Sequence, residues 1–234
     1  MTTLQTKGDY QERILANVDN CLTETDLGKG EKYRGKVRDR YDLGDCLAMV
    51  TTDRQSAFDR VLAAIPFKGQ ALNLTSRWWF DKTSDIVANH VLEVPDPNVT
   101  MAKKCEVFPI EFVVRGYMTG SSGTSLWTVY NKGDREYCGH PLPEGMIKNQ
   151  SLDQIMLTPT TKEAHDRPIS EDGILSEGWM TEEDWRQASA VAMELFSYGQ
   201  RVAREHGLIL VDTKYEMGKD AEGNLTLVDE IHTP

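Results

Sequence analysis

Two apolar runs near the C-terminus are the feature that most constrains how this chain folds. The first, at residues 208–218, begins apolar and then alternates apolar with charged side chains. A polar stretch at 220–224 supplies turn residues, and a second apolar run covers residues 225–231. Two such runs joined by a short polar turn predict a β-hairpin.

One face of the first predicted strand is charged. Residues i, i+2 and i+4 of a strand share a face, which places Asp212, Lys214 and Glu216 together. A compact turn that pairs even with odd positions would add Asp229, with its Cβ about 5 Å from its cross-strand neighbour. Carboxylates this close repel one another, so a divalent metal brought in by a nucleotide phosphate would convert repulsion into coordination. The alternative is a solvated acidic face on which Lys214 merely pairs with Glu216.

A run of alternating cations lies near the other end of the chain. It occupies every second position, at Lys32, Arg34, Lys36, Arg38 and Arg40. In a single strand these residues form one positive face suited to polyphosphate, with a turn at 42–45 and an apolar return strand at 46–50. The alternative is an edge strand whose cations discourage pairing with another sheet. A nucleotide clamped between this hairpin and the acidic one would account for both patterns.

The composition limits other functions. The 234 residues are 39% hydrophobic and 27% charged, enough to bury a core in one large domain or two lobes. A net charge of −11 argues against nucleic acid as a main partner. The 4 cysteines are widely spaced without zinc-site spacing, which is typical of reduced thiols. No run approaches the roughly 20 apolar residues of a membrane span, and no signal peptide is recognisable, so a cytoplasmic protein without a membrane partner is expected.

The order of the remaining patterns predicts an α+β protein. A helix is expected at residues 71–82, with its aromatic side chains in the core. Another helix begins at Thr181 with a sequence typical of a capping box and ends at Gly207. A turn rich in proline precedes a strand-like run at 103–114.

This turn indicates a lobe boundary near Lys104. The predicted domains are therefore an N-terminal lobe of residues 1–104, with the basic hairpin, and a C-terminal lobe of residues 105–234, with the acidic hairpin.

Three further places carry candidate binding residues. The strand ending at Arg115 opens into a Gly/Ser/Thr loop, whose backbone N–H groups and hydroxyls, beside a two-pronged cation, would bind a phosphate. The alternative is a loop that is simply flexible. Asp59 follows a predicted buried strand, where functional groups are common, although neighbouring polar residues would also serve as caps. Lys162 lies in a loop and could reach a nucleotide phosphate, or could be an ordinary surface residue.

Several segments resemble, in the same order, the SAICAR synthetase family. Residues 107–121 resemble its central signature, and residues 210–218 resemble its second signature, with Met217 where the family usually has Phe or Ile. Shorter matches lie at residues 33–39, 56–59 and 228–231, so the resemblance spans the chain from about Tyr33 to its last residue.

The resemblance implies a fold and an activity. The expected fold is α+β and two-lobed, distantly similar to protein kinases, with ATP in the cleft between the lobes. The expected enzyme is an ATP-dependent ligase of purine biosynthesis that joins L-aspartate to the carboxylate of carboxyaminoimidazole ribonucleotide and releases ADP and phosphate. The expected route is phosphoryl transfer to the substrate carboxylate, followed by attack of the aspartate amine on the acyl phosphate.

On the nucleotide side, the resemblance implies contacts to ATP and Mg²⁺. Lys36 and Arg38 are expected to contact ATP phosphates, and Lys162 is also assigned to ATP. Glu216 and Asp229 are expected to hold the magnesium ion.

The resemblance implies that Asp212 supports the magnesium ligands Glu216 and Asp229. On the substrate side, it places Lys214 between ATP and the acceptor carboxylate. Arg115 and Ser121 are expected to bind the phosphate of the ribonucleotide, and Asp59 is assigned to substrate binding. No motif places the pocket for aspartate, and the oligomeric state stays open.

The family pattern differs from this chain at its last residues. Family members usually continue past the equivalent of residues 232–234 into an acidic, serine-containing segment with an Arg that contacts the nucleotide substrate. This chain ends at Pro234. The expectation is that it binds ATP better than it catalyses ligation.

Two other functions stay open on the sequence. A small-molecule kinase would phosphorylate a hydroxyl without depending on aspartate, although the motifs H-R-D and D-F-G of protein kinases are absent. A non-catalytic module would hold Mg-ATP without turnover, which the retention of both Glu216 and Asp229 disfavours.

Overall fold

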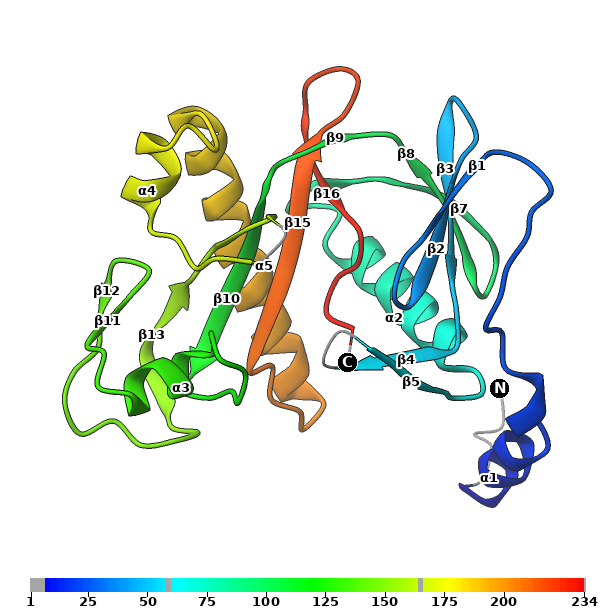
Figure 1. Cartoon of the computed structure of the whole chain (residues 1–234), viewed down its shortest axis with the longest axis horizontal. Helices are drawn as coiled ribbons and strands as arrows, with labels where there is room; N and C mark the ends of the chain where they lie inside the picture. Colours follow the sequence, from blue (N-terminus) through cyan, green and yellow to red (C-terminus); the bar gives the residue numbers. More distant parts are fainter. Residues whose placement is uncertain (1–6, 58–59, 164–165, 234) are drawn as a thin grey trace. The chain divides into compact units, whose positions relative to one another are not determined.

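The computed structural model describes residues 7–57, 60–163 and 166–233. The chain divides into two compact units, each with its own sheet (Figure 1). Unit 1 comprises Met1–Asp81, His90–Lys104 and Thr233–Pro234, and unit 2 comprises Lys82–Asn89 and Cys105–His232. One passage between the units follows Lys104. Residues 82–89 belong to unit 2, in which β6 (Ala88–Asn89) pairs with β16 (Leu225–Val228).

Unit 1 is built on a five-stranded antiparallel sheet with the order β1-β2-β3-β8-β7. The strands are β1 (Glu31–Arg34), β2 (Arg38–Asp42), β3 (Cys46–Thr51), β7 (Val91–Asp96) and β8 (Val99–Lys103). A hairpin of β4 (Arg54–Ala57) and β5 (Arg60–Ala64) stands apart from this sheet. Tyr41, Ala48 and Val50 form a buried cluster on the sheet, which confirms the predicted apolar return strand.

The predicted helix at residues 71–82 is α2 (Lys68–Lys82). Its buried stripe includes Leu72 and Phe80, whereas Trp78 is 44% exposed. Assigning all of its aromatic side chains to the core is therefore wrong for Trp78, because position 78 falls outside the stripe that a period of 3.6 residues generates. Trp78 instead packs edge-on against Trp79, with ring centroids 4.8 Å apart.

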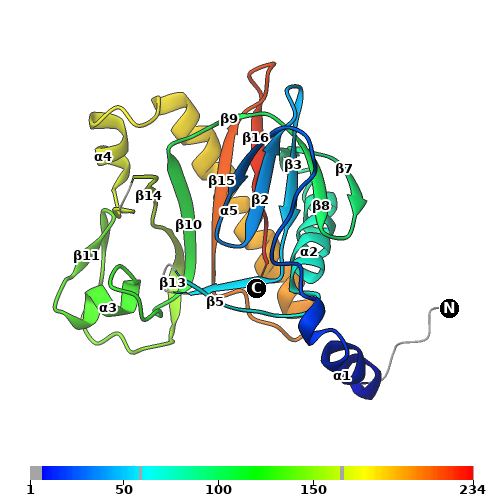
Figure 2. The same ribbon diagram turned by 45° about the vertical axis from the view of Figure 1, so that its right-hand side comes forward.

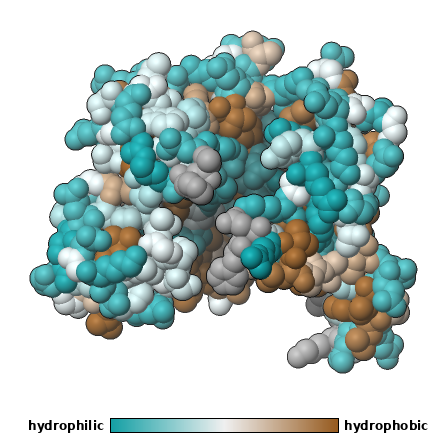
Figure 3. All heavy atoms as spheres, in the orientation of Figure 1, coloured by the Kyte–Doolittle hydropathy of each residue, from teal (hydrophilic) through white to brown (hydrophobic). Residues whose placement is uncertain are grey.

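Two short helices precede the sheet of unit 1. They are α1 (Lys7–Leu15) and η1 (Val18–Asn20). Helix α1 exposes Ile14 and Leu15, and this apolar surface is visible at the lower right of Figure 3.

The alternating run of cations forms two strands, so the prediction of one positive strand face is wrong. Residues 35–37 form a bend, and β1 and β2 pair in a register that places Lys32 opposite Tyr41 and Arg34 opposite Asp39. Gly35 makes the bend possible, because its N–H donates to the carbonyl of Arg38 at 2.9 Å and a Cβ at Gly35 would lie 2.5 Å from that oxygen.

The physical reason for the bend is a buried charge. Asp39 is 0% exposed and pairs with Arg54, which is 2% exposed, at 2.5 Å. Arg54 also donates to the carbonyl oxygens of Thr23, Gly35 and Lys36 at 2.7, 3.0 and 3.1 Å. Burial alone would raise the pKa of Asp39, but hydrogen bonds from Arg54 and others outweigh it and lower that pKa. One buried guanidinium therefore fixes both the acid and the bend that carries Lys36.

Unit 2 is built on a larger sheet with the order β13-β10-β15-β16-β6, in which β14 also pairs with β10 and β9 with β15. Its further strands are β9 (Glu106–Val107), β10 (Ile110–Tyr117), β13 (Ser151–Leu157), β14 (Thr160–Thr161) and β15 (Asp212–Lys219). A small hairpin of β11 (Glu136–Tyr137) and β12 (His140–Pro141) and the helices α3 (Leu126–Asn131) and α4 (Glu171–Ser176) complete the unit with α5 (Glu182–Glu205). The strand-like run predicted at 103–114 is thus divided among three strands.

The central strands β10 and β15 lie side by side, with α5 along one face of the sheet (Figures 1 and 2). Phe112 of β10 stacks on Trp185 of α5, with ring centroids 5.6 Å apart and planes 16° apart. Phe112 and Tyr215 are both fully buried on this face. The helix predicted from Thr181 is confirmed, and its role is packing.

Replacing Thr181 with alanine is expected to lower the free energy of unfolding by about 1 kcal/mol. The Oγ1 of Thr181 accepts a hydrogen bond from the N–H of Asp184 at 3.1 Å, which satisfies one of the free donors at the start of α5. Chemical denaturation of T181A and of T181S, which keeps the hydroxyl, checks this. Equal destabilisation in the two variants would contradict the capping role.

Among residues 7–57, 60–163 and 166–233, no helix combines the length and the apolar character that crossing a membrane requires.

Candidate active site

The predicted acidic hairpin exists as β15 and β16, and its first strand carries the charged face. Strand β15 begins at Asp212, later than predicted, since residues 208–211 form no strand. Its register with β10 places Asp212 opposite Arg115 and Lys214 opposite Val113. Directly opposed residues share a face, so the charged side chains lie on the face of the sheet away from Phe112 and Tyr215.

Charges of alternating sign form a continuous chain on this face. Lys214 Nζ lies 2.7 Å from Glu111 Oε1 and 3.3 Å from Glu216 Oε1. The other carboxylate oxygen of Glu216 is bonded by Lys162 Nζ. The Oγ1 of Thr160 donates to Glu111 Oε2 at 3.2 Å, so that both oxygens of Glu111 are bound. We call the four charged residues, Glu111, Lys214, Glu216 and Lys162, the charge chain.

The charge chain holds Lys214 in its protonated form. Partial burial alone would lower the pKa of Lys214, but the hydrogen bond to Glu111 and the charges of Glu216, Glu111 and Asp229 outweigh it, so the pKa is raised. The two carboxylates are only 13% and 15% exposed, which keeps water from screening them fully. The arrangement presents a fixed ammonium group to any anion that binds on this face.

Glu111 is a site residue that the sequence reasoning missed. It lies four positions before Arg115 on β10, whose burial alternates along its whole length. The same period of two that places Arg115 on the charged face also places Glu111 there. Lys162, for which a role as an ordinary surface residue stayed open, is likewise brought to Glu216.

The register of the hairpin at Asp229 differs from the one that the sequence predicts. The register pairs Glu216 with Val228, even with even, so Asp229 is not the cross-strand neighbour on the charged face. Strand β16 ends at Val228, and Asp229 has a left-handed backbone with φ of 63°. Its negative charge nevertheless contributes to the raised pKa of Lys214, so the turn brings this carboxylate into the field of the ammonium group.

The carboxylates of Glu216 and Asp229 fit a magnesium ion in type and number. Among the described residues, no cluster of three or more acidic, histidine or cysteine side chains could hold a metal by itself. Mg²⁺ is usually held by one or two carboxylates together with substrate phosphates. Both oxygens of Glu216 already face ammonium groups, so this carboxylate is oriented toward positive charge.

Arg115 is held in place on the same face. Its Nε donates to Thr158 Oγ1 at 2.9 Å, and its Nη1 lies 3.5 Å from Asp212 Oδ2. Its side chain is 12% exposed. Ser121 lies in the exposed loop that follows β10, and a hydrogen bond from Trp127 N of α3 to Thr119 O at 3.1 Å joins the start of the helix to the start of this loop.

Two of the three remaining predicted residues, Lys36 and Arg38, belong to unit 1. Lys36 is exposed at the bend between β1 and β2, and Arg38 Nε donates to Thr51 Oγ1 at 3.2 Å. Asp59 lies outside the described residues. The binding roles predicted for these three residues stay predictions.

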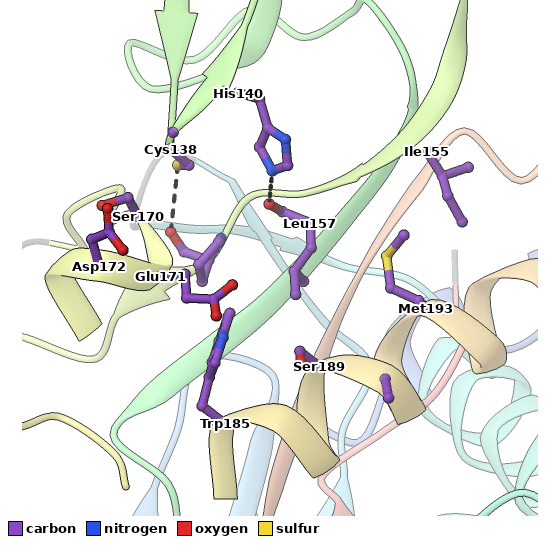
Figure 4. Close-up of a pocket in the computed structure, with 13 residues that line it drawn as sticks. Cys138, His140, Ile155, Leu157, Ser170, Glu171, Asp172, Trp185, Ser189 and Met193 are labelled. Carbon is purple, nitrogen blue, oxygen red and sulfur yellow. Dashed lines mark hydrogen bonds between the residues drawn. The ribbon is translucent and has the colours of Figure 1, made fainter. Parts of the chain in front are cut away.

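A cavity of about 450 Å³ lies on the opposite, α5-covered face of the unit 2 sheet (Figure 4). Leu157 lines it and pairs with buried Val114, so the cavity opens on the face away from the charge chain. His140 Nε2 lies 2.7 Å from the carbonyl oxygen of Leu157 there, and burial raises the pKa of the Cys138 thiol to about 12. Of the predicted site residues that the structure describes, none lines this cavity.

Two solved structures share the fold of this chain. A SAICAR synthase from Saccharomyces cerevisiae, in complex with SAICAR, matches with a TM-score of 0.81 and 32% identity over 91% of this chain and 77% of that chain. A SAICAR synthetase in complex with ADP matches with a TM-score of 0.70 and 25% identity over 86% and 80%. The mixed α/β fold of this chain is thus the fold of the SAICAR synthetases.

Sequence comparison identifies the family. The SAICAR synthetase family model matches residues 31–234. The phosphoribosylaminoimidazole-succinocarboxamide synthase of Legionella pneumophila (strain Paris) is 67% identical over 215 residues, which is 92% of this chain and 69% of that protein. The chain belongs to the SAICAR synthetase family.

Relatives in plants are similar but longer. The synthase of Arabidopsis thaliana, named chloroplastic, is 56% identical over 240 residues. The match covers 100% of this chain and 58% of that protein.

Proposed function

We propose that this chain uses ATP to join L-aspartate to the carboxylate of carboxyaminoimidazole ribonucleotide, which is the SAICAR synthase reaction of purine biosynthesis. Family membership supports the ligase activity. The charge chain around Lys214 supports it physically, since a carboxylate and a triphosphate repel each other and react only where fixed positive charge brings them together.

The proposed reaction has two steps. The γ-phosphoryl group of ATP moves to a carboxylate oxygen of the ribonucleotide, which forms an acyl phosphate and ADP. The amine of aspartate then attacks the acyl carbon, an amide bond forms, the amine loses a proton and phosphate leaves. Both steps involve little covalent chemistry by the protein, so positioning and electrostatic stabilisation dominate.

Lys214 is the proposed catalytic cation. Glu111 and Glu216 hold its ammonium group from two sides, so the charge stays in place without reorganisation as negative charge shifts between the reactants. We propose that Glu111 acts as a positioning residue for Lys214, with Asp212 supporting the same strand. The expected position of Lys214, between ATP and the acceptor carboxylate, follows from this role.

ATP phosphates are the proposed ligands of Lys36, Arg38 and Lys162, and the placement of ATP between two lobes stays part of this proposal. Glu216 and Asp229 would hold Mg²⁺, which when bound neutralises charge on the phosphates.

For the ribonucleotide, Arg115 and Ser121 are the proposed phosphate ligands, and Asp59 is proposed to bind substrate. Asp212 and Thr158 hold the guanidinium of Arg115, so a fixed fork rather than a mobile side chain would meet the phosphate. The expected cytoplasmic location also stays a prediction.

A coupled assay of ADP release, with each substrate omitted in turn, tests the function. Release is expected only with ATP, the ribonucleotide and aspartate together, and omission of aspartate is expected to lower it by at least about tenfold. A small-molecule kinase would release ADP without aspartate, and a binding module would hold Mg-ATP without releasing ADP. Either result contradicts the proposal.

A further inference from the structure

The segment that follows β16 adopts a backbone that its own residues disfavour. Asp229 and His232 have φ values of 63° and 49°, both in the left-handed region. For residues other than glycine this conformation costs of order 1 kcal/mol and persists where surrounding contacts impose it. The contacts that impose it are therefore part of how Asp229 is placed.

A built pocket receives the end of this segment within unit 2. His232 Nε2 lies 2.6 Å from the Oη of Tyr215, and the two rings meet at 60° with centroids 5.5 Å apart. Ile231, just before it, is fully buried. Burial also lowers the pKa of His232 to about 4, so the imidazole is neutral at physiological pH.

Helix α5 leaves room for the imidazole at Gly199. A Cβ added at Gly199 would lie 2.4 Å from Cε1 of His232 and 2.9 Å from its Nδ1. Glycine inside a helix costs about 1 kcal/mol relative to alanine. The added Cβ would also lie 2.8 Å from Leu210 Cδ2, so the close approach of His232 and Leu210 together is the physical reason that glycine fits this position.

Strand β15 contributes residues to the charge chain on one face and to this pocket on the other. Tyr215 lies between Lys214 and Glu216 on β15, and its side chain points to the buried face while theirs point to the charged face. The returning segment is thus tied to the strand that carries Lys214, whose ammonium group lies in the field of Asp229.

We propose that Tyr215 and His232 form a latch that holds residues 229–232 against β15 and α5 and so positions the Asp229 carboxylate for binding of Mg-ATP. Both are positioning residues on the face of the sheet away from the nucleotide. The inference rests on the proposed function, because it presumes that Asp229 acts on a metal–nucleotide complex.

Calorimetric titrations of the full chain with MgATP, and with ATP in EDTA, test the latch. Tyr215→Phe removes only the hydroxyl and is expected to weaken MgATP binding by about fivefold, the effect of one lost hydrogen bond, while leaving the binding of metal-free ATP unchanged. His232→Ala is expected to act in the same direction. The double variant is expected to be no weaker than His232→Ala alone, because both changes break one contact.

Gly199→Ala supplies an independent perturbation. Alanine favours the helix, yet its methyl group would displace the imidazole, so MgATP binding is expected to fall even if the melting temperature does not. Tyr198→Phe and His206→Ala are the matched controls on the same helix and at its end, and both are expected to bind MgATP as the unmodified chain does.

Three results would overturn the latch. The first is unchanged MgATP binding in both Tyr215→Phe and His232→Ala. The second is an equal loss of affinity for MgATP and for metal-free ATP that follows the melting temperature. The third is an unmodified chain that binds MgATP no more tightly than metal-free ATP. Failure of the proposed function gives a different result: the unmodified chain would bind MgATP more tightly than metal-free ATP but would show no aspartate-dependent release of ADP.

Discussion

Replacing Lys214 with methionine is expected to lower kcat for aspartate-dependent ADP release by about 10²–10³-fold. Methionine keeps most of the length of the side chain and removes the charge that Glu111 and Glu216 hold in place. Loss of one preorganised cation or donor at a centre of developing charge has effects of this size in other enzymes. Steady-state kinetics with saturating substrates measure the loss.

Lys219→Met is the matched control for this prediction. Lys219 lies on the same strand, but its ammonium group pairs with Asp184 at the start of α5, 2.7 Å away, and not with the charge chain. This variant is expected to keep kcat within about twofold, because it loses one ordinary ion pair. Circular dichroism of both variants shows whether the fold is retained. A folded Lys214→Met variant with the kcat of the control would remove Lys214 from the mechanism.

Replacing Arg54 with alanine is expected to lower the free energy of unfolding by about 3–5 kcal/mol. The substitution leaves Asp39 charged, fully buried and without its guanidinium, and it removes the donors to three backbone carbonyl groups. Breaking one side of a buried ion pair is costly, because Asp39 then depends on a hydrogen bond from Thr25 and on the partly exposed Lys32, whose ammonium group lies 3.3 Å away. Denaturant unfolding followed by circular dichroism measures the change.

Arg34→Ala is the control for Arg54. The side chains of Arg34 and its partner Glu24 are 53% and 63% exposed, and they lie 2.8 Å apart. An exposed pair of this kind contributes at most about 1 kcal/mol. Arg54→Lys is expected to recover only part of the lost stability, because an ammonium group cannot replace the planar fork. A midpoint for Arg54→Ala equal to that of Arg34→Ala would contradict the role assigned to the buried pair.

Patterns of short period proved reliable in this chain. The alternation along residues 212–216 places three charged side chains on one face, and the structure confirms it. The cap at Thr181 and the apolar stripe that follows are found as predicted in α5. Both predictions depend on local geometry alone, because a period of 2.0 or 3.6 residues determines which side chains of a strand or helix share a face.

The wrong predictions concern places where residues far apart in the sequence determine the local backbone conformation. The alternating cations satisfied the pattern of one strand, yet a buried pair between Asp39 and Arg54, 15 residues apart, divides the run at Gly35. A compact turn that pairs even with odd positions predicts Asp229 on the charged face of β15, but the observed register differs by one residue. A slip of one position reverses the face of every side chain, and only the paired strands fix it.

The sequence by itself determined the family, the predicted ligase chemistry and which side chains of each strand share a face. Tertiary structure alone decided which charged groups form ion pairs. Lys214 pairs with Glu111, 103 residues away in the sequence, and Glu216 pairs with Lys162, 54 residues away. The physical reason is that periodicity is a property of one segment, whereas a contact between charges depends on the pairing of strands and on the burial that holds them there.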